Sequence, residues 1–164
     1  MQVLVKMAGL ACLLAFWAPM AQAQGTNVAF GALKTDITQP VKVTADQLAV
    51  NQADGTASFT GNVVIVQGDM KLQAGTVLIT YSADNRAIKS LHADGGVTVA
   101  AGPDAATSDS ADYMPDTGEL ILQGAVVLTQ GQVALSGQKL TLSLKSGLGT
   151  MSGRVTTIFT PGKN

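Results

Sequence analysis

Carboxylates and a single histidine are the side chains of this sequence that are best suited to chemistry. A pair of carboxylates is sufficient for glycoside hydrolysis, because one can act as the acid and the other as base or nucleophile. Five aspartates, however, lie within two residues of glycine or asparagine in predicted turns, namely Asp54, Asp69, Asp84, Asp94 and Asp116. A short acceptor side chain that bonds to the local backbone explains them, so turns are favoured over a catalytic pair.

A metal site or a nucleophilic enzyme is also not predicted. Asp104, Asp109, Asp112 and Asp116 offer oxygen ligands, but their spacing lacks the regular pattern of a calcium-binding loop. His92 is the only histidine, and the sequence contains no Gly-x-Ser-x-Gly, Walker or His-Glu-x-x-His motif. The standard routes of nucleophilic and metal-assisted catalysis are therefore excluded, and no cofactor is expected. An enzyme acting on cell-envelope polysaccharide is the most distant alternative.

The amino terminus predicts export. Residues 1–23 contain Lys6, an apolar run over residues 7–20 and Ala21-Gln22-Ala23, which together are typical of a secretory signal cleaved after Ala23. Pro19 interrupts the run, which is shorter than a membrane-spanning helix requires. Cleavage would remove the only cysteine and the only tryptophan and leave nine basic and eleven acidic residues, a net charge of −2. A charge so small and mixed does not favour nucleic acid as a partner.

The rest of the sequence predicts one all-β domain over residues 40–160. Short runs of Val, Ile, Leu and Thr alternate with Gly, Asp and Asn, which indicates about a dozen short strands and no helix. Residues 24–39 are expected to be loosely ordered, residues 100–112 to form a long hairpin loop, and residues 161–164 to form a tail.

A spaced Gly-x-Val motif recurs along this domain. It begins at Gly61, Gly95, Gly124 and Gly153, with spacings of 34, 29 and 29 residues. A shift of 63 residues also aligns Gln67-Gly68 with Gln130-Gly131. Periods of this size predict stacked supersecondary units, each of which cannot bury its apolar face alone.

Aliphatic side chains outnumber aromatic ones. Hydrophobic residues make up 46% of the sequence, yet beyond the signal segment the aromatic residues are only Phe30, Phe59, Tyr81, Tyr113 and Phe159. Sugars and bases usually bind aromatic platforms, so neither is favoured as a ligand. Runs such as residues 63–66 and 126–128 are apolar on both faces, which indicates either a filled sandwich core or an apolar ligand that covers one face.

The sequence resembles the LptA family of periplasmic lipopolysaccharide-export bridge proteins, also called OstA-like. The resemblance rests on Phe59-Thr60-Gly61-Asn62-Val63 followed by Gln67-Gly68, and on Arg154-Val155-Thr156-Thr157 near the end. Weaker support comes from Gln39-Pro40-Val41, Ala45-Asp46, Leu72-Gln73-Ala74, Leu122-Gln123-Gly124 and Pro161. Together these stretches span most of the chain beyond the signal segment.

The resemblance implies an open, twisted β-jellyroll in the periplasm of a Gram-negative bacterium, which shields the lipid A acyl chains of lipopolysaccharide. It also implies partners of the same export system, one anchored in the inner membrane and one in the outer-membrane translocon, and head-to-tail self-association. The alternative that the residues leave open is a structural β-solenoid of the periplasm without a ligand.

Strand periodicity selects the residues expected to line the groove, because alternate side chains of a strand share one face. By parity they are Val41, Val43, Val63, Ile65, Val97, Val99, Leu120, Leu122, Val126, Leu128, Leu140 and Leu142. Phe59, Leu72, Tyr113, Leu135 and Phe159 are expected to join them.

Overall fold

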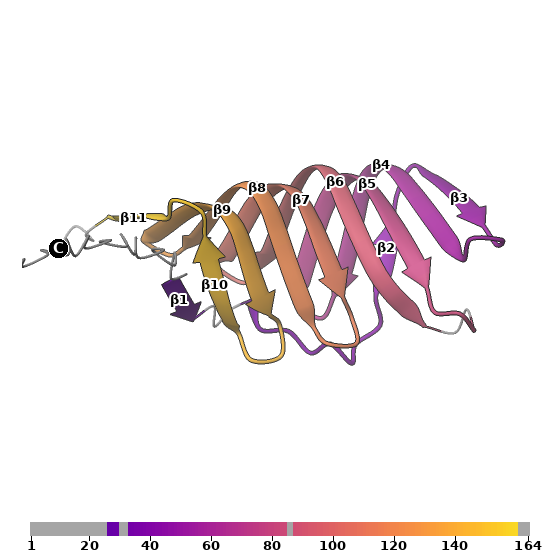
Figure 1. Ribbon diagram of the computed structural model, residues 1–164, viewed down its shortest axis with the longest axis horizontal. Coiled ribbons are helices and arrows are strands. Elements are labelled where there is room, and N and C mark those ends of the chain that lie inside the picture. The colour runs from indigo at the N-terminus through magenta and orange to yellow at the C-terminus, as the bar shows by residue number, and fades with distance from the viewer. Residues whose placement is uncertain (1–25, 30–32, 85–86, 161–164) are drawn as a thin grey trace, which may run out of the picture.

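The computed structural model describes residues 26–29, 33–84 and 87–160, which form one antiparallel sheet (Figure 1). The predicted signal segment and the tail lie outside the described residues. The strands are β1 (Thr26–Ala29), β2 (Lys42–Thr44), β3 (Gln47–Asn51), β4 (Thr56–Gln67), β5 (Met70–Tyr81), β6 (Ile88–Ala101), β7 (Asp104–Met114), β8 (Glu119–Gln130), β9 (Val133–Ser143), β10 (Leu148–Ser152) and β11 (Thr156–Phe159). No helix among the described residues is long and apolar enough to cross a membrane.

From β4 to β10 the order of the strands follows the chain, and the exceptions lie at the two ends of the sheet. The path runs β1-β10-β9-β8-β7-β6-β5-β4-β2, while β3 also pairs with β4 and β11 also pairs with β9. Strand β1 therefore lies at the opposite end of the sheet from β2, although the two are close in sequence. The predicted all-β class is confirmed.

The recurring Gly-x-Val motif marks the corners at which the chain bends. The backbone has positive φ at both Gly61 and Asn62 (+81° and +48°), at Gly124 and Ala125 (+78° and +43°), and likewise at residues 95–96 and 153–154. Within β4, β6 and β8 the pairing register shifts at these same places. Such bulges bend a strand and reset which side chains face inward.

The corners divide the sheet into two facing layers. Layer A contains β1, β3, β10 and residues 56–60, 76–81, 88–94, 110–114, 119–123 and 139–143. Layer B contains β2, β11 and residues 63–67, 70–74, 97–101, 104–107, 126–130 and 133–137. The layers join along the row of corners, and their hairpin turns form the opposite edge, which we call the open side.

The predicted hairpin loop at residues 100–112 is wrong. Most of this segment belongs to β7, and the turn is confined to the residues between Ala101 and Asp104. Small side chains alternate along β7, and Ala106 and Ala111 are 1% exposed where they face the core. Pairing with β6 and β8 satisfies the backbone, so a segment rich in Asp, Ala and Ser forms a central strand.

Substitution of Gly124 by alanine is expected to lower the free energy of unfolding by about 2–5 kcal/mol. A left-handed backbone costs an alanine about 1–2 kcal/mol, and overpacking adds about 1–3 kcal/mol. The overpacking arises because the added Cβ would lie 2.8 Å from the Cβ of Asp109. Urea denaturation of the wild-type and G124A proteins measures the difference.

The matched control is Gly96→Ala in the neighbouring corner. Gly96 also has positive φ (+80°), but an added Cβ would meet no atom within 4 Å. G96A is expected to carry only the backbone cost, about 1–2 kcal/mol. An equal decrease in the free energy of unfolding in the two variants would show that the contact with Asp109 is not the reason for glycine at position 124.

Candidate apolar binding groove

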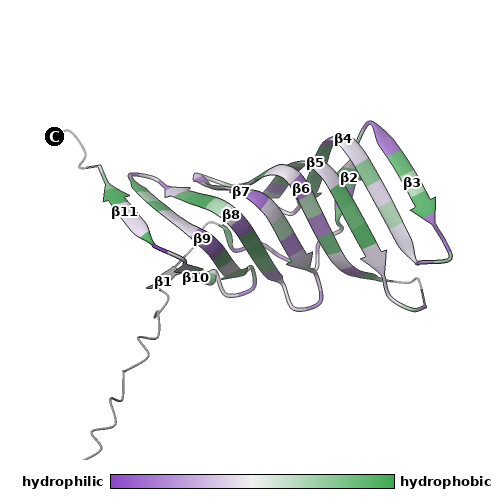
Figure 2. Ribbon diagram, turned by 45° about the horizontal axis from the view of Figure 1, so that its top comes forward, coloured by the Kyte–Doolittle hydropathy of each residue, from purple (hydrophilic) through white to green (hydrophobic). Residues whose placement is uncertain are grey.

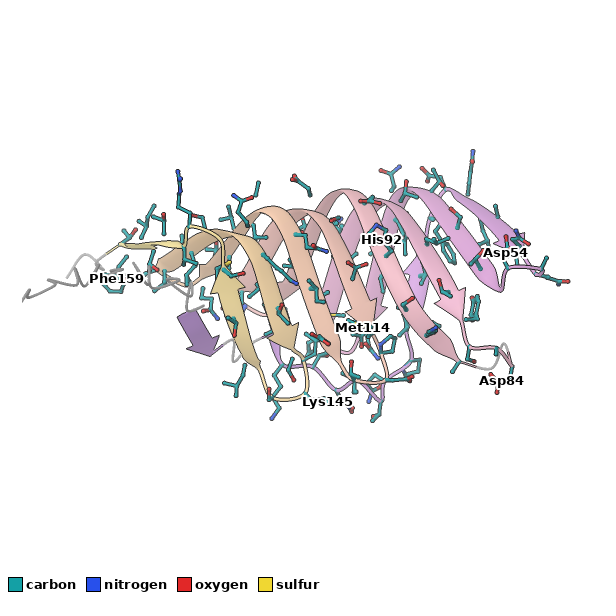
Figure 3. All side chains as sticks on the ribbon, viewed as in Figure 1. Asp54, Asp84, His92, Met114, Lys145 and Phe159 are labelled. Atoms are coloured by element: carbon teal, nitrogen blue, oxygen red, sulfur yellow. The ribbon has the colours of Figure 1, made fainter. Side chains whose placement is uncertain are left out.

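The space between the layers is lined by most of the residues that the sequence assigns to a groove. Thirteen of them belong to a single buried cluster: Val63, Ile65, Leu72, Val97, Val99, Tyr113, Leu120, Leu122, Val126, Leu128, Leu135, Leu140 and Leu142. Val41, Val43 and Phe59 are partly buried and contact this cluster. Phe159 is 64% exposed and lies at the far end of the molecule (Figure 3).

Periodicity missed other members of the cluster. Val77 and Ile79 are 0% and 2% exposed because the register shift after Gln73 turns odd-numbered residues of β5 inward. The signal that could have placed the bulge is Gly75-Thr76-Val77, another Gly-x-Val within β5, although Gly75 lacks the positive φ of the other corner glycines. Leu33 is fully buried and Thr35 is 8% exposed, although both fall in the segment for which the sequence predicts loose order.

In the central strands the protein fills this space with its own side chains. The thirteen buried residues named above are at most 4% exposed. At this density an added hydrocarbon chain has no room unless the layers separate or side chains move. The described structure is therefore a closed form of the interior.

At the β3 end the interior surface opens to solvent. Leu48 and Val50 of β3 are 57% and 62% exposed. They stand opposite Phe59 and Ala57 across the β3–β4 pair, so they share the inward face of layer A. Figure 2 shows the apolar stretch of β3 at this end. A depression of about 470 Å³ lies beside it, lined by Val50, Asn51, Gln52, Gly55, Thr56 and Tyr81.

The other end of the interior is also apolar. Phe159 stands opposite Val133 in the β11–β9 pair, and Val133 packs against the core cluster. Residues opposite one another share a face, so Phe159 extends the inward face of layer B beyond the covered region. Exposed apolar side chains thus continue the interior at both ends of the sheet.

His92 lies on the outer face and links three strands. Its Nδ1 is 2.6 Å from Oδ1 of Asp112, its Nε2 is 2.9 Å from Oδ2 of Asp94, and Gln123 Nε2 donates to Oδ2 of Asp112. The hydrogen bond with Asp112 raises the pKa of His92 above its usual value. The two carboxylates lie at opposite ring nitrogens and cannot converge on one metal ion. No metal-binding group of His, Cys, Asp and Glu occurs in the described part of the chain.

Comparisons with known proteins agree with this architecture. The family model described as "LptA/(LptD N-terminal domain) LPS transport protein" matches residues 42–148. The uncharacterized protein R00383 of Rhizobium meliloti is 31% identical over 149 residues, which are 84% of this chain and 80% of that protein. Lipopolysaccharide export system protein LptA of Haemophilus influenzae is 38% identical over 53 residues, 32% of this chain and 31% of its own.

A solved structure shares the fold. LptH of Pseudomonas aeruginosa, described as the LptA homologous periplasmic component of a lipopolysaccharide transport device, superposes with a TM-score of 0.69 at 19% identity. The superposition covers 77% of this chain and 99% of that one, and confirms the predicted jellyroll. Because the family model extends from β2 to the first residue of β10, the chain belongs to the LptA/(LptD N-terminal domain) family of LPS transport proteins.

Proposed function

We propose that this protein is a periplasmic carrier that binds lipopolysaccharide, shields the lipid A acyl chains between its two layers and bridges inner- and outer-membrane export components. The observation that carries the proposal is one apolar interior that runs the length of the sheet and is exposed at both ends. Family membership and the similarity to LptA and LptH, proteins of lipopolysaccharide export and transport, support lipopolysaccharide as the ligand. The proposed role is transport without catalysis.

The physical need for a carrier follows from the ligand. Each CH₂ group removed from water contributes about 0.8 kcal/mol, so an acyl chain of about a dozen carbons resists aqueous transfer by roughly 10 kcal/mol. An aliphatic interior offsets that cost. It also lets a chain slide between similar sites, since apolar contacts are non-directional and do not hold it in one place. Directed movement then requires energy from a partner, because equal sites bias nothing.

The closed interior is compatible with binding if the layers separate on the open side. The layers are covalently continuous at the corners, and the ladder bonds lie within each layer. Separation therefore exchanges contacts between apolar side chains for contacts with acyl chains and leaves the ladders intact. Apolar contacts are non-directional, so one set can replace the other at similar free energy.

The sheet ends suit head-to-tail association. Strand β2 runs towards a corner, where Asp46 N donates to Gly61 O, whereas β11 runs away from the corner at residues 153–154. A neighbour's β2 placed beside β11 would therefore be antiparallel to it, as in the rest of layer B. Edge strands with unpaired backbone groups are templates for such addition.

Photocrosslinking in cells tests the carrier proposal. A photoreactive residue at Val41, Val63 or Leu122 is expected to give lipopolysaccharide adducts, because these positions line the interior. The control is Lys71, which is exposed on the outer face of layer B. Adducts from the three interior positions and none from position 71 would support the carrier.

A ligand-free structural role is the second candidate, and the close packing of the central strands favours it. The same experiment separates the two. If the three interior positions give no more adduct than position 71 in cells that export lipopolysaccharide, the interior is a filled core and the carrier proposal fails.

A further inference from the structure

A segment near the amino terminus crosses the open side. Residues 33–39, which we call the strap, run between the hairpin turns of the two layers, along the lower edge of the molecule in Figure 1. Thr35 contacts both layers. Its backbone N donates to Leu144 O in a layer A turn over 3.1 Å, and its Oγ1 donates to Gln67 O in layer B over 3.1 Å.

The side chain of Gln67 also holds the strap through hydrogen bonds. Its side-chain Nε2 donates to Ile37 O over 2.9 Å and to Gln39 O over 3.0 Å. Its Oε1 accepts a hydrogen bond of 2.6 Å from Tyr113 OH, which comes from layer A. Gln67 and Tyr113 are 1% and 3% exposed. One buried amide, with both of its donor hydrogens and its oxygen engaged, thus ties together layer B, layer A and the strap.

The strap contains a turn that is stabilised by hydrogen bonds within the strap itself. Asp36 Oδ1 accepts hydrogen bonds from Thr38 N and Thr38 Oγ1, and Gln39 N donates to Asp36 O. Leu33 anchors the segment by inserting a fully buried side chain into the core cluster. Beyond this anchor, residues 34–39 have internal turn bonds and a few bonds to their surroundings, so they can lift together, whereas removal of a strand would break a ladder.

We propose that the strap is a lid over the open side, that Gln67 is the residue that holds it closed, and that the lid lifts when acyl chains enter. The inference rests on the proposed carrier function and names the gate of that same interior. A lifted strap leaves room for a phosphorylated headgroup in water along the open side while its chains move between the layers. The strap itself does not pair with either end of the sheet.

Substitution Gln67→Glu tests the lid, because it keeps the size of the side chain and its acceptor for Tyr113 but replaces the donor to Ile37 O and Gln39 O. In Q67E, hydrogen exchange of the Thr35 amide is expected to accelerate at least about tenfold. Association of a fluorescent polyene fatty acid, followed by stopped flow, is expected to accelerate by a similar factor. Lipid at saturation is expected to accelerate Thr35 exchange in the wild type.

The matched control is Gln73→Glu, the same substitution on the exposed outer face of layer B, for which both rates are expected to stay within about twofold. Thr35→Val is a second variant on the strap itself. It removes the hydroxyl that donates to Gln67 O and does not alter the sheet, so it tests the lid even if Q67E fails to fold. T35V is expected to accelerate both rates by a smaller factor than Q67E.

The outcomes separate the lid from the carrier. If the fatty acid binds the wild type, but Thr35 exchange is unchanged at saturation and Q67E and T35V associate at the control rate, the lid is overturned and the carrier stands. If the fatty acid binds none of the proteins at equilibrium, the shielding of acyl chains fails and the lid has no function. Faster exchange and association in both strap variants would support the lid.

Discussion

Substitution of Leu48 by aspartate is expected to reduce lipopolysaccharide adducts from a photoreactive residue at position 122 to less than about a tenth, without loss of folding. Leu48 lies on the inward face at the open β3 end, where the interior meets solvent. A carboxylate there must lose water whenever an acyl chain passes, at a cost of several kcal/mol. Since Leu48 is 57% exposed on an edge strand, its replacement removes little core contact.

Ala49→Asp is the control, because Ala49 is exposed on the same strand and alternation places it on the opposite face. Thermal unfolding of the two variants is expected to be similar, whereas the adduct yield is expected to fall only in L48D. Equal yields in L48D and A49D would show that acyl chains do not pass the β3 end.

Much of the fold follows from local sequence signals. The Gly-x-Val recurrence marks the corners because each corner has two consecutive residues with positive φ, and the first of these positions accepts little other than glycine. At Gly61 and Gly124 a side chain from the neighbouring segment, Asp46 or Asp109, occupies the place of a Cβ. The second position tolerates side chains, as Asn62, Ala125 and Arg154 show. The repeat can therefore be recognised from the sequence alone, whereas its role as a corner appears only in the structure.

Face assignment succeeded where a strand keeps the same parity on both sides of its bend and failed where the parity changes. Leu120, Leu122, Val126 and Leu128 keep even numbers on both sides of the β8 corner, and all four are buried. In β5, by contrast, the inward residues are even-numbered up to Ala74 and odd-numbered from Val77, because the pairing register shifts between them. Gly75-Thr76-Val77 marks this bend, but the motif alone does not say by how many residues the register shifts there.

The strap could not be predicted for a different reason. Gln67 precedes Gly68 and lies next to the β4–β5 turn, but the partners of its side-chain hydrogen bonds lie 28, 30 and 46 residues away. Nothing local distinguishes an amide in an exposed turn from a buried one that joins two layers. The sequence of residues 33–39 is polar and short, so burial of Leu33 emerges only once both layers are assembled.

The same amino-terminal region that forms the strap also covers one sheet end. Strand β1 pairs antiparallel with β10 and lies at the end of layer A, whereas β3 lies at the other end of the same layer. Both strands run from the corners towards the open side, since each is antiparallel to a strand that runs towards a corner. A neighbour's β3 could therefore pair antiparallel with β10 only where β1 now lies.

Removal of residues 24–29 is accordingly expected to strengthen head-to-tail self-association by at least about tenfold, because it leaves the edge of β10 free for a neighbour's β3. Sedimentation velocity over a range of concentrations measures the association constant of the wild-type and shortened chains. The shortened chain retains the strap, so a change in association does not depend on the lid. An unchanged distribution of masses would show that β1 does not compete for this edge.

The converse variant fixes β1 in place. Asn27 and Thr150 are register partners in the β1–β10 pair, and opposite Cα atoms in an antiparallel pair lie about 4.5–5.5 Å apart, within the range of a disulfide. The Asn27→Cys, Thr150→Cys protein is expected to associate more weakly than wild type when oxidised and to recover on reduction. Because oxidation and reduction act on one and the same chain, recovery would tie association to the release of β1 and not to the substitutions. Oxidised protein that assembles as readily as reduced protein would contradict the proposed exchange of strands.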